Sequence, residues 1–181
     1  MTDGRKRRLV ERLADPEFLE GMSNRSMDEL RAMREEAREG ENELSFERRL
    51  CQARVDILSA ELDRRSGQGD DDLLARLPSI LSSEMGGGRG ESPLPSRAPD
   101  FSIPRNADVP RRRVEEVVGE QTLARLGTLP SEEIKGILGS LAEHEREVSS
   151  KRKVVQEVMD KVQAEIVRRY VSGEADPTSL S

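Results

Sequence analysis

The chain has 181 residues, of which 36% are charged, 34% hydrophobic and 2% aromatic, and it contains no tryptophan. This composition argues against a single compact globular core and is typical of long helices or coiled coils mixed with disordered segments. The formal net charge of -6 disfavours direct binding to nucleic acid or to anionic membranes, because both attract basic proteins.

The N-terminal stretch has a basic start but lacks the apolar centre of a signal peptide. No window approaches the roughly eighteen apolar residues that a spanning helix needs, so we expect a cytoplasmic protein that is not membrane-bound. Cys51 is the only cysteine and His144 the only histidine, so we expect no intrachain disulfide and no metal site. We interpret Cys51 as a core residue and His144 as a hydrogen-bonded or solvated side chain.

The first elements read from the sequence are an N-terminal extension and a long helix. Residues 1–25 are predicted to be an extension whose short helix begins at Pro16. Ser26, followed three residues later by Glu29, has the pattern of a capping box, in which each residue caps the other's backbone amide. Helical periodicity then predicts a long helix over 26–66.

A linker and a second long helix follow. Residues 67–130 are rich in Gly, Pro, Ser and Asp, which predicts a flexible and partly disordered connection. Inside it, 70–81 and 114–129 have the apolar spacing of short helices. The second long helix is predicted over 131–171, opened by a serine cap, and 172–181 is predicted to be a disordered tail.

The two long helices are copies of one another. An offset of 104 residues lays 27–65 over 131–169, with many identical pairs and the apolar positions preserved. Apolar residues return every seven positions in both copies, as in a coiled-coil seam. Neither helix can bury its seam alone, so we expect the two to pair. The linker can reach either end of the first helix, so the spacing leaves parallel and antiparallel pairing open.

The repeat also contains a duplicated polar pattern beside the seam. Five residues at offsets of 0, 4, 7, 11 and 15 fall within an arc of about 80° on a helix. All five are identical in the second copy, although their neighbours differ. Solvation requires only polarity, so this identity indicates that geometry is used. We call these residues the first and second polar stripes: Glu41, Ser45, Arg48, Gln52 and Asp56, and Glu145, Ser149, Arg152, Gln156 and Asp160.

The apolar seam thins beside the stripes. Heptad spacing expects apolar residues near 40 and 47, but the chain has Gly40 and Glu47, which align with His144 and Lys151. A polar surface between helices costs stability unless its groups find partners. We therefore expect this gap to provide the place for a bound ligand.

The side-chain types in the stripes suit guanine and phosphate. The planar fork of Arg matches phosphate or the O6 and N7 acceptors of guanine, and carboxylates accept hydrogen bonds from guanine N1–H and its 2-amino group. Gln and Ser suit sugar or phosphate oxygens. Two copies related by a pseudo-two-fold axis favour a ligand that is itself two-fold symmetric, and cyclic di-GMP fits that description.

The spacing E(x)3S(x)2R(x)3Q(x)3D, present twice on two long helices, resembles the RsiG family of cyclic di-GMP-dependent anti-sigma factors of sporulating actinobacteria. The resemblance implies an all-α fold built on a long antiparallel two-helix coiled-coil hairpin. It implies that the ten stripe residues bind a dimer of cyclic di-GMP. It also implies that the loaded protein sequesters a WhiG-type sporulation sigma factor, which we expect in a 1:1 complex.

Two other functional classes are weaker. A ligand-independent coiled-coil scaffold would use the stripes only to set register, although such proteins usually need one buried polar residue per helix. An enzyme is not expected, because the sequence offers no nucleophile with a base, no metal cluster and no phosphate-binding loop.

Overall fold

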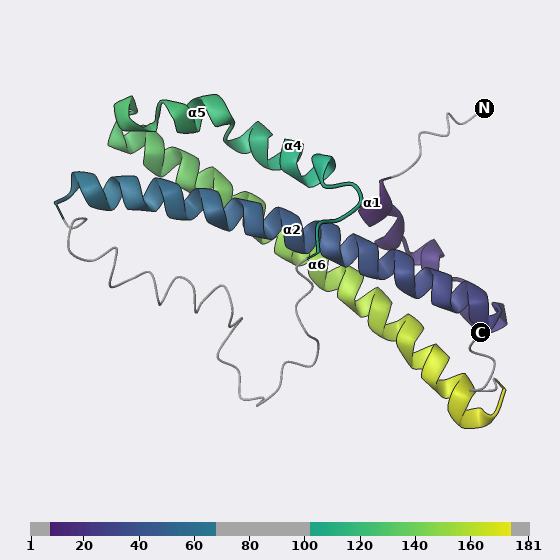
Figure 1. Ribbon diagram of the computed structural model, residues 1–181. Helices are drawn as coiled ribbons and strands as arrows, with labels where there is room; N and C mark the ends of the chain where they lie inside the picture. The colour runs from purple at the N-terminus through teal and green to yellow at the C-terminus, as the bar shows by residue number, and fades with distance from the viewer. Residues whose placement is uncertain (1–7, 68–101, 175–181) are drawn as a thin grey trace.

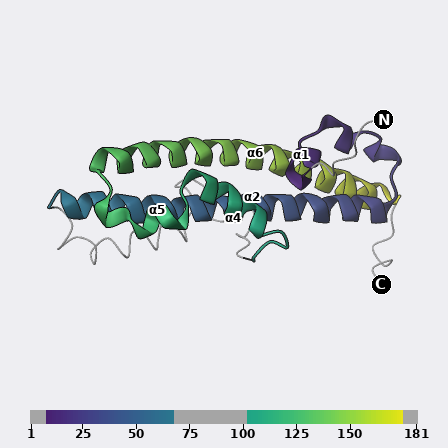
Figure 2. The ribbon, with the colours of Figure 1, turned by 90° about the horizontal axis from the view of Figure 1, so that it is seen from above.

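The molecule is built on two long helices that run beside each other (Figures 1 and 2). The computed structural model describes residues 8–67 and 102–174, and every regular element within them is helical, which confirms the all-α class. The elements are α1 (Leu9–Leu13), the 3-10 turns η1 (Pro16–Leu19) and η2 (Met22–Asn24), α2 (Met27–Arg65), α4 (Asp108–Val117), α5 (Glu120–Ala124), the 3-10 turn η3 (Leu126–Thr128) and α6 (Ser131–Ser172).

The long helices α2 and α6 are antiparallel. Arg31, near the start of α2, donates to the Tyr170 hydroxyl near the end of α6 at 2.7 Å. At the opposite end of the hairpin, Arg65 of α2 lies within 3.4 Å of the hydroxyl of Ser131, the first residue of α6. The direction that spacing left open, and that the family resemblance implied, is therefore confirmed.

The beginnings of the two helices differ. The predicted capping box at the start of α2 is confirmed, because the Ser26 hydroxyl accepts from the Glu29 amide at 3.2 Å and Glu29 accepts from the Ser26 amide at 2.6 Å. The predicted serine cap of α6 is wrong. Ser131 is the first helical residue, and Pro130 occupies the cap position without a side-chain bond. Proline at this position fixes the backbone angle φ, but its side chain has no oxygen that could accept a hydrogen bond from an amide of the first helical turn.

Short helices before each long helix cover the hairpin. The predicted helix at Pro16 is a 3-10 turn, preceded by α1. In the linker, the pattern over 114–129 belongs to α4, α5 and η3, although α4 begins earlier, at Asp108. The segment 70–81, the glycine-rich run after it and residues 175–181 lie outside the described residues. None of the described helices is long and apolar enough to cross a membrane.

The duplication is larger than the two long helices. With the offset of 104, η2 (Met22–Asn24) falls on η3 (Leu126–Thr128), and the first residue of η1 falls on the first residue of α5. The same offset lays α1 on the last five residues of α4, so that Val10 corresponds to Val114, and both side chains are buried. Each half of the chain is therefore one structural unit, in which short α-helical or 3-10 segments lead into a long helix.

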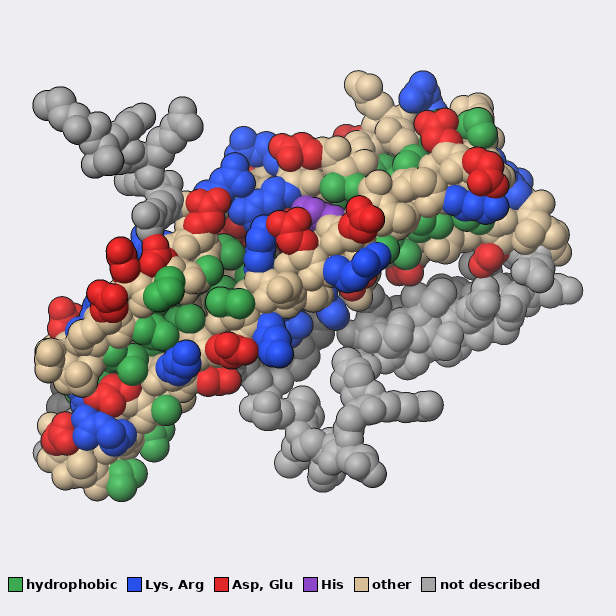
Figure 3. All heavy atoms as spheres, turned by 180° about the vertical axis from the view of Figure 1, so that it is seen from behind, with side chains coloured by type: hydrophobic (Ala, Val, Ile, Leu, Met, Phe, Trp, Pro, Cys, Tyr) green, Lys and Arg blue, Asp and Glu red, His purple; other side chains and the backbone are tan. Residues whose placement is uncertain are grey.

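The core is a thin aliphatic seam between these units. Leu30, Leu44 and Leu58 of α2 are fully buried, as are Ile134 and Leu141 of α6. The predicted heptad seam is thereby confirmed. Seen from behind, acidic and basic side chains alternate over the middle of the molecule, and hydrophobic side chains gather toward the half that holds the start of α2 (Figure 3).

Candidate ligand-binding site

Antiparallel packing brings the two polar stripes together. Gln52 Nε2 on α2 donates to Glu145 Oε1 on α6 at 3.2 Å, and Gln156 Nε2 on α6 donates to Glu41 Oε1 on α2 at 3.2 Å. The second bond is the first with the helices exchanged, because Gln156 is the repeat of Gln52 and Glu145 is the repeat of Glu41. The two stripes are therefore related by a local pseudo-two-fold axis.

Glu41 accepts hydrogen bonds from several other stripe residues. Its Oε1 accepts from the hydroxyl of Ser45 at 3.0 Å, from Arg152 Nε at 2.8 Å and from Gln156. The equivalent arginine, Arg48, makes no hydrogen bond or ion pair with the described residues. One arginine of the pair is thus held by a carboxylate, whereas the other is available.

The stripes lie at the edge of the seam, partly accessible to solvent. The two aspartates, Asp56 and Asp160, are exposed at the ends of the stripes. The other eight stripe residues are half-buried: Glu41, Ser45, Arg48, Gln52, Glu145, Ser149, Arg152 and Gln156. Half-buried charges attract a ligand more strongly than fully solvated ones, because water screens them less.

The opposite flank of the seam holds a buried charge cluster that sequence reasoning missed. The carboxylate of Glu47, only 1% exposed, lies 2.8 Å from His144 Nε2 and 2.8 Å from Arg113 Nη1 of α4. Arg113 Nη2 also lies 3.5 Å from Glu43. Glu43 and Glu47 fall on the side of α2 away from its stripe, so α4 packs on that side. The interpretation of His144 as a hydrogen-bonded side chain is confirmed.

The thin part of the seam is filled by protein, which corrects one expectation. Glu47 is engaged in the charge cluster, and Gly40 is buried beneath Leu13 of α1. A Cβ atom at position 40 would overlap the end of the Leu13 side chain, so glycine permits this close approach without a shift of Leu13. The stripes therefore lie along the outer edge of the seam and do not line a gap in it.

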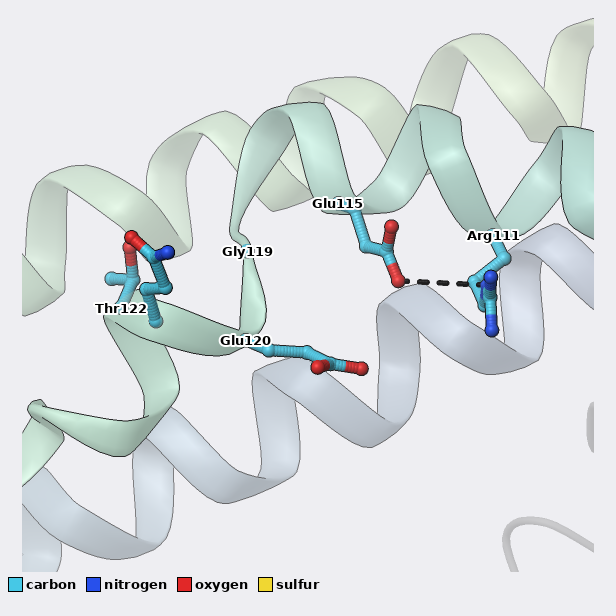
Figure 4. Close-up of a pocket in the computed structure, with 6 residues that line it drawn as sticks. Arg111, Glu115, Gly119, Glu120 and Thr122 are labelled. Carbon is cyan, nitrogen blue, oxygen red and sulfur yellow. Dashed lines mark ion pairs between the residues drawn. The ribbon is translucent and has the colours of Figure 1, made fainter.

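A surface hollow elsewhere is not part of this site. It lies where α4 meets α5 and is lined by Arg111, Glu115, Gly119, Glu120, Gln121 and Thr122 (Figure 4). Its ion pair joins two residues of the same helix, Arg111 and Glu115, at 3.6 Å. No stripe residue lines the hollow, and the stripes offer the richer set of polar groups.

Cys51 lies in the apolar seam beside the stripes. Burial raises the pKa of the Cys51 thiol to about 11, with further contributions from Glu47 and Glu145, so the thiolate needed for reactivity is suppressed. Cys51 is fully buried in the seam, which confirms its interpretation as a core residue. Within 8–67 and 102–174, no group of three or more His, Cys, Asp or Glu side chains is arranged to hold a metal ion.

Comparison with known proteins identifies the family. The RsiG-like family model matches residues 16–81 and 120–181, and each matched segment contains one polar stripe. The two segments begin 104 residues apart, which is the offset of the structural repeat. No curated protein matches the chain. Proteins of the RsiG type are regulatory anti-sigma factors with a sigma-factor partner and are not enzymes. The chain belongs to the RsiG-like family of anti-sigma factors.

Proposed function

We propose that the two polar stripes bind a dimer of cyclic di-GMP and that the loaded protein sequesters a sporulation sigma factor of the WhiG type. The observation that carries the proposal is the pair of equivalent bonds, Gln52 to Glu145 and Gln156 to Glu41. They align two identical sets of side chains about one pseudo-two-fold axis. A two-fold symmetric ligand can make the same contacts with both sets.

The arginines and the carboxylates of the stripes have different roles in the proposed site. Arg48 and Arg152 offer forks for phosphates or for guanine O6 and N7. Asp56 and Asp160, together with the stripe glutamates, accept from the N1–H and 2-amino donors of guanine. Each cyclic di-GMP molecule carries two phosphate charges. A bound dimer therefore places about four negative charges near two guanidinium groups, which favours their release from protein carboxylates.

Ligand binding requires an exchange of partners. Arg152 is held by Glu41, so phosphate must replace that carboxylate, whereas Arg48 needs no such exchange. The exchange couples the ligand to the packing of α2 against α6. Ligand promotes capture of the sigma factor only through its differential affinity for the bound state, and by linkage the sigma factor tightens ligand binding by the same factor. A fall in cyclic di-GMP then releases sigma to RNA polymerase in the cytoplasm.

Calorimetric titration of stripe variants tests the ligand site. Arg48→Ala and Asp56→Ala are each expected to abolish binding of cyclic di-GMP while circular dichroism shows unchanged helix content. Arg112→Ala is the matched control, because Arg112 is an exposed arginine on α4 that belongs to neither stripe. Wild-type affinity in both stripe variants would reject the site.

Co-purification tests whether cyclic di-GMP controls binding of the sigma factor. A WhiG-type sigma factor is expected to be retained by the immobilised full chain in a 1:1 complex when cyclic di-GMP is present, and to be lost when the nucleotide is omitted. Equal capture without nucleotide would reject ligand gating while leaving the sigma-factor interaction intact.

One observation favours the second candidate, a ligand-independent scaffold. The cross-helix bonds of Glu41 and Gln52 form without any ligand, as expected of polar residues that only set register. Thermal melting separates the two functions. A ligand specific for the folded protein stabilises it by about 2.7 kcal/mol at a hundred times its Kd, so an unchanged midpoint with cyclic di-GMP would favour the scaffold.

A further inference from the structure

The repeat contains a second duplicated pattern, separate from the polar stripes. Glu61, Arg64 and Arg65 end α2, and the same three residue types recur at Glu165, Arg168 and Arg169 near the end of α6. Both sets therefore lie at the ends of the hairpin, where each long helix finishes beside the beginning of the other.

Arg65 binds the turn that leads into α6. Its Nη2 donates to the Leu126 carbonyl at 2.8 Å, and its Nη1 donates to the carbonyl of Leu129 and lies 3.4 Å from the Ser131 hydroxyl. Its Nε donates to Glu61 at 2.7 Å. One guanidinium thus ties the last turn of α2 to the segment immediately before α6.

Arg169 repeats this arrangement at the other end. It donates to the Met22 carbonyl at 3.1 Å, to the Ser23 carbonyl at 3.0 Å and to the carbonyl of Arg25, all in the turn before α2. Its Nε donates to Glu165 at 2.8 Å. Met22 and Arg25 are the repeats of Leu126 and Leu129, so the two arginines bind equivalent carbonyls.

The paired glutamates hold the guanidinium groups in place. Hydrogen bonds from the two neighbouring arginines lower the pKa of Glu61 and of Glu165 to about 2, so both are ionised throughout the physiological range. Arg169 is only 7% exposed, and it donates four hydrogen bonds to protein acceptors. The planar fork of arginine spans several carbonyls at once, which a lysine ammonium cannot do in the same way.

We propose that Arg65 and Arg169 are positioning residues that fix the axial register of α2 against α6. An apolar heptad seam is nearly indifferent to a slip of one heptad, which moves one helix by about 10 Å along the other. The carbonyls that the two arginines bind occur at one place each, so only one register satisfies both ends. The consequence for the stripes rests on the proposed function: register decides whether the two sets of ligand contacts face each other.

A distance measurement in the ligand-free protein tests the register directly. Spin labels are placed at Ala32 on α2 and Ser150 on α6, which are exposed and lie at different heights along the hairpin. In Arg65→Ala/Arg169→Ala the distance distribution is expected to broaden or shift by several ångströms, with helix content kept. Arg64→Ala/Arg168→Ala is the matched control, because these arginines are 62% and 49% exposed and bind the same glutamates. Its distribution is expected to equal that of the wild type.

A second readout connects the register to the ligand. The Arg65→Ala/Arg169→Ala protein is expected to lose about tenfold or more in affinity for cyclic di-GMP, although neither arginine belongs to a stripe. If the double variant fails to fold, the single variants are measured, each of which loosens one end only. An unchanged distance distribution in a folded variant would overturn the proposal. Absence of cyclic di-GMP binding in the wild type would overturn the proposed function and leave the register test decisive.

Discussion

Single residues decide how the repeated unit is adapted in each half of the molecule. Gly40 and His144 occupy equivalent positions in the repeat. In the first unit, the missing side chain of Gly40 lets Leu13 of α1 pack directly on α2. In the second unit, His144 joins the charge cluster of Glu47 and Arg113, which fastens α4. One short helix is therefore docked by apolar contact and the other by buried charge.

The apolar contact predicts a destabilising substitution. Gly40→Ala adds a methyl group that must displace the end of the Leu13 side chain; overpacking of this kind costs about 1–3 kcal/mol, and the better helix propensity of alanine offsets about 0.5–1 kcal/mol of it. Gly136→Ala is the control, because a Cβ there meets no neighbouring atom and alanine favours the helix by about 0.5–1 kcal/mol. Urea denaturation measures both. Equal stabilisation by the two substitutions would show that α1 does not pack on Gly40 in solution.

The charged contact predicts a dependence on pH. Burial raises the pKa of Glu43, and the nearby guanidinium of Arg113 only partly opposes this. A carboxyl whose pKa is raised by folding contributes stability below its unfolded pKa and loses it as pH rises through the folded pKa. Glu43→Gln is therefore expected to melt at a higher temperature than the wild type at about pH 8, with the difference closing toward about pH 4.

The Glu43→Gln variant changes the charge of Glu43 without breaking the neighbouring ion pair. Arg113 keeps its ion pair with Glu47 at 2.8 Å, so removing the charge of Glu43 does not leave a buried guanidinium unpaired. Glu35→Gln, at an exposed glutamate on α2, is the control and is expected to melt like the wild type across this range. A lower midpoint for Glu43→Gln at about pH 8 would mean that attraction to Arg113 outweighs the cost of burial.

At the scale of elements, the two long helices begin by different means. Ser26 caps α2 through reciprocal bonds with Glu29, whereas Ser131 follows a proline cap. Ser26→Ala is expected to cost about 1 kcal/mol, because a free amide at a helix start loses its acceptor. Ser131→Ala is expected to cost only a few tenths of a kcal/mol, because Ser131 does not cap the helix. Thermal denaturation of the two variants checks the difference, and equal losses would contradict it.

The elements that the sequence predicts correctly are those determined by local periodicity. Heptad spacing identifies α2 and α6 and their seam, and the capping box identifies the start of α2. The docking of α1 and α4 depends instead on contacts between distant residues, such as Gly40 with Leu13 and Glu47 with Arg113. No pattern of single-helix spacing encodes such contacts. The short helices also escaped the repeat search, because apart from pairs such as Val10 and Val114 their sequences have diverged.

The candidate site, too, is predicted in part by the sequence pattern and in part depends on contacts between distant residues. Identity of the stripes identifies the ten residues, and antiparallel packing brings the two sets together. Binding of cyclic di-GMP by these residues stays a prediction. The inequality between Arg48 and Arg152 could not be anticipated, because it arises from which side chain reaches Glu41 across the seam.

At the scale of the whole molecule, one chain contains two equivalent units that pack about a pseudo-two-fold axis. The stripes lie near the centre of the hairpin, and the Arg65 and Arg169 contacts lie at its two ends. Each end of the hairpin holds an arginine that fits only one register, and the middle retains polar groups that can exchange partners. Symmetry then becomes a measurable property, since equivalent substitutions in the two units have equal effects wherever the contacts are equal.

The ligand-free protein tests this symmetry. Gln52→Ala and Gln156→Ala each remove one 3.2 Å bond to an equivalent glutamate, so both are expected to cost about 1 kcal/mol and to agree within about 0.5 kcal/mol. Arg152→Ala removes a partly buried ion pair with Glu41 and is expected to cost about 0.5–1 kcal/mol, whereas Arg48→Ala is expected to cost almost nothing. Urea denaturation of the four variants measures these differences. Equal losses for the two arginines would mean that Arg48 pairs with Glu145 in solution, as the symmetry operation requires, and that the ligand must release both guanidinium groups.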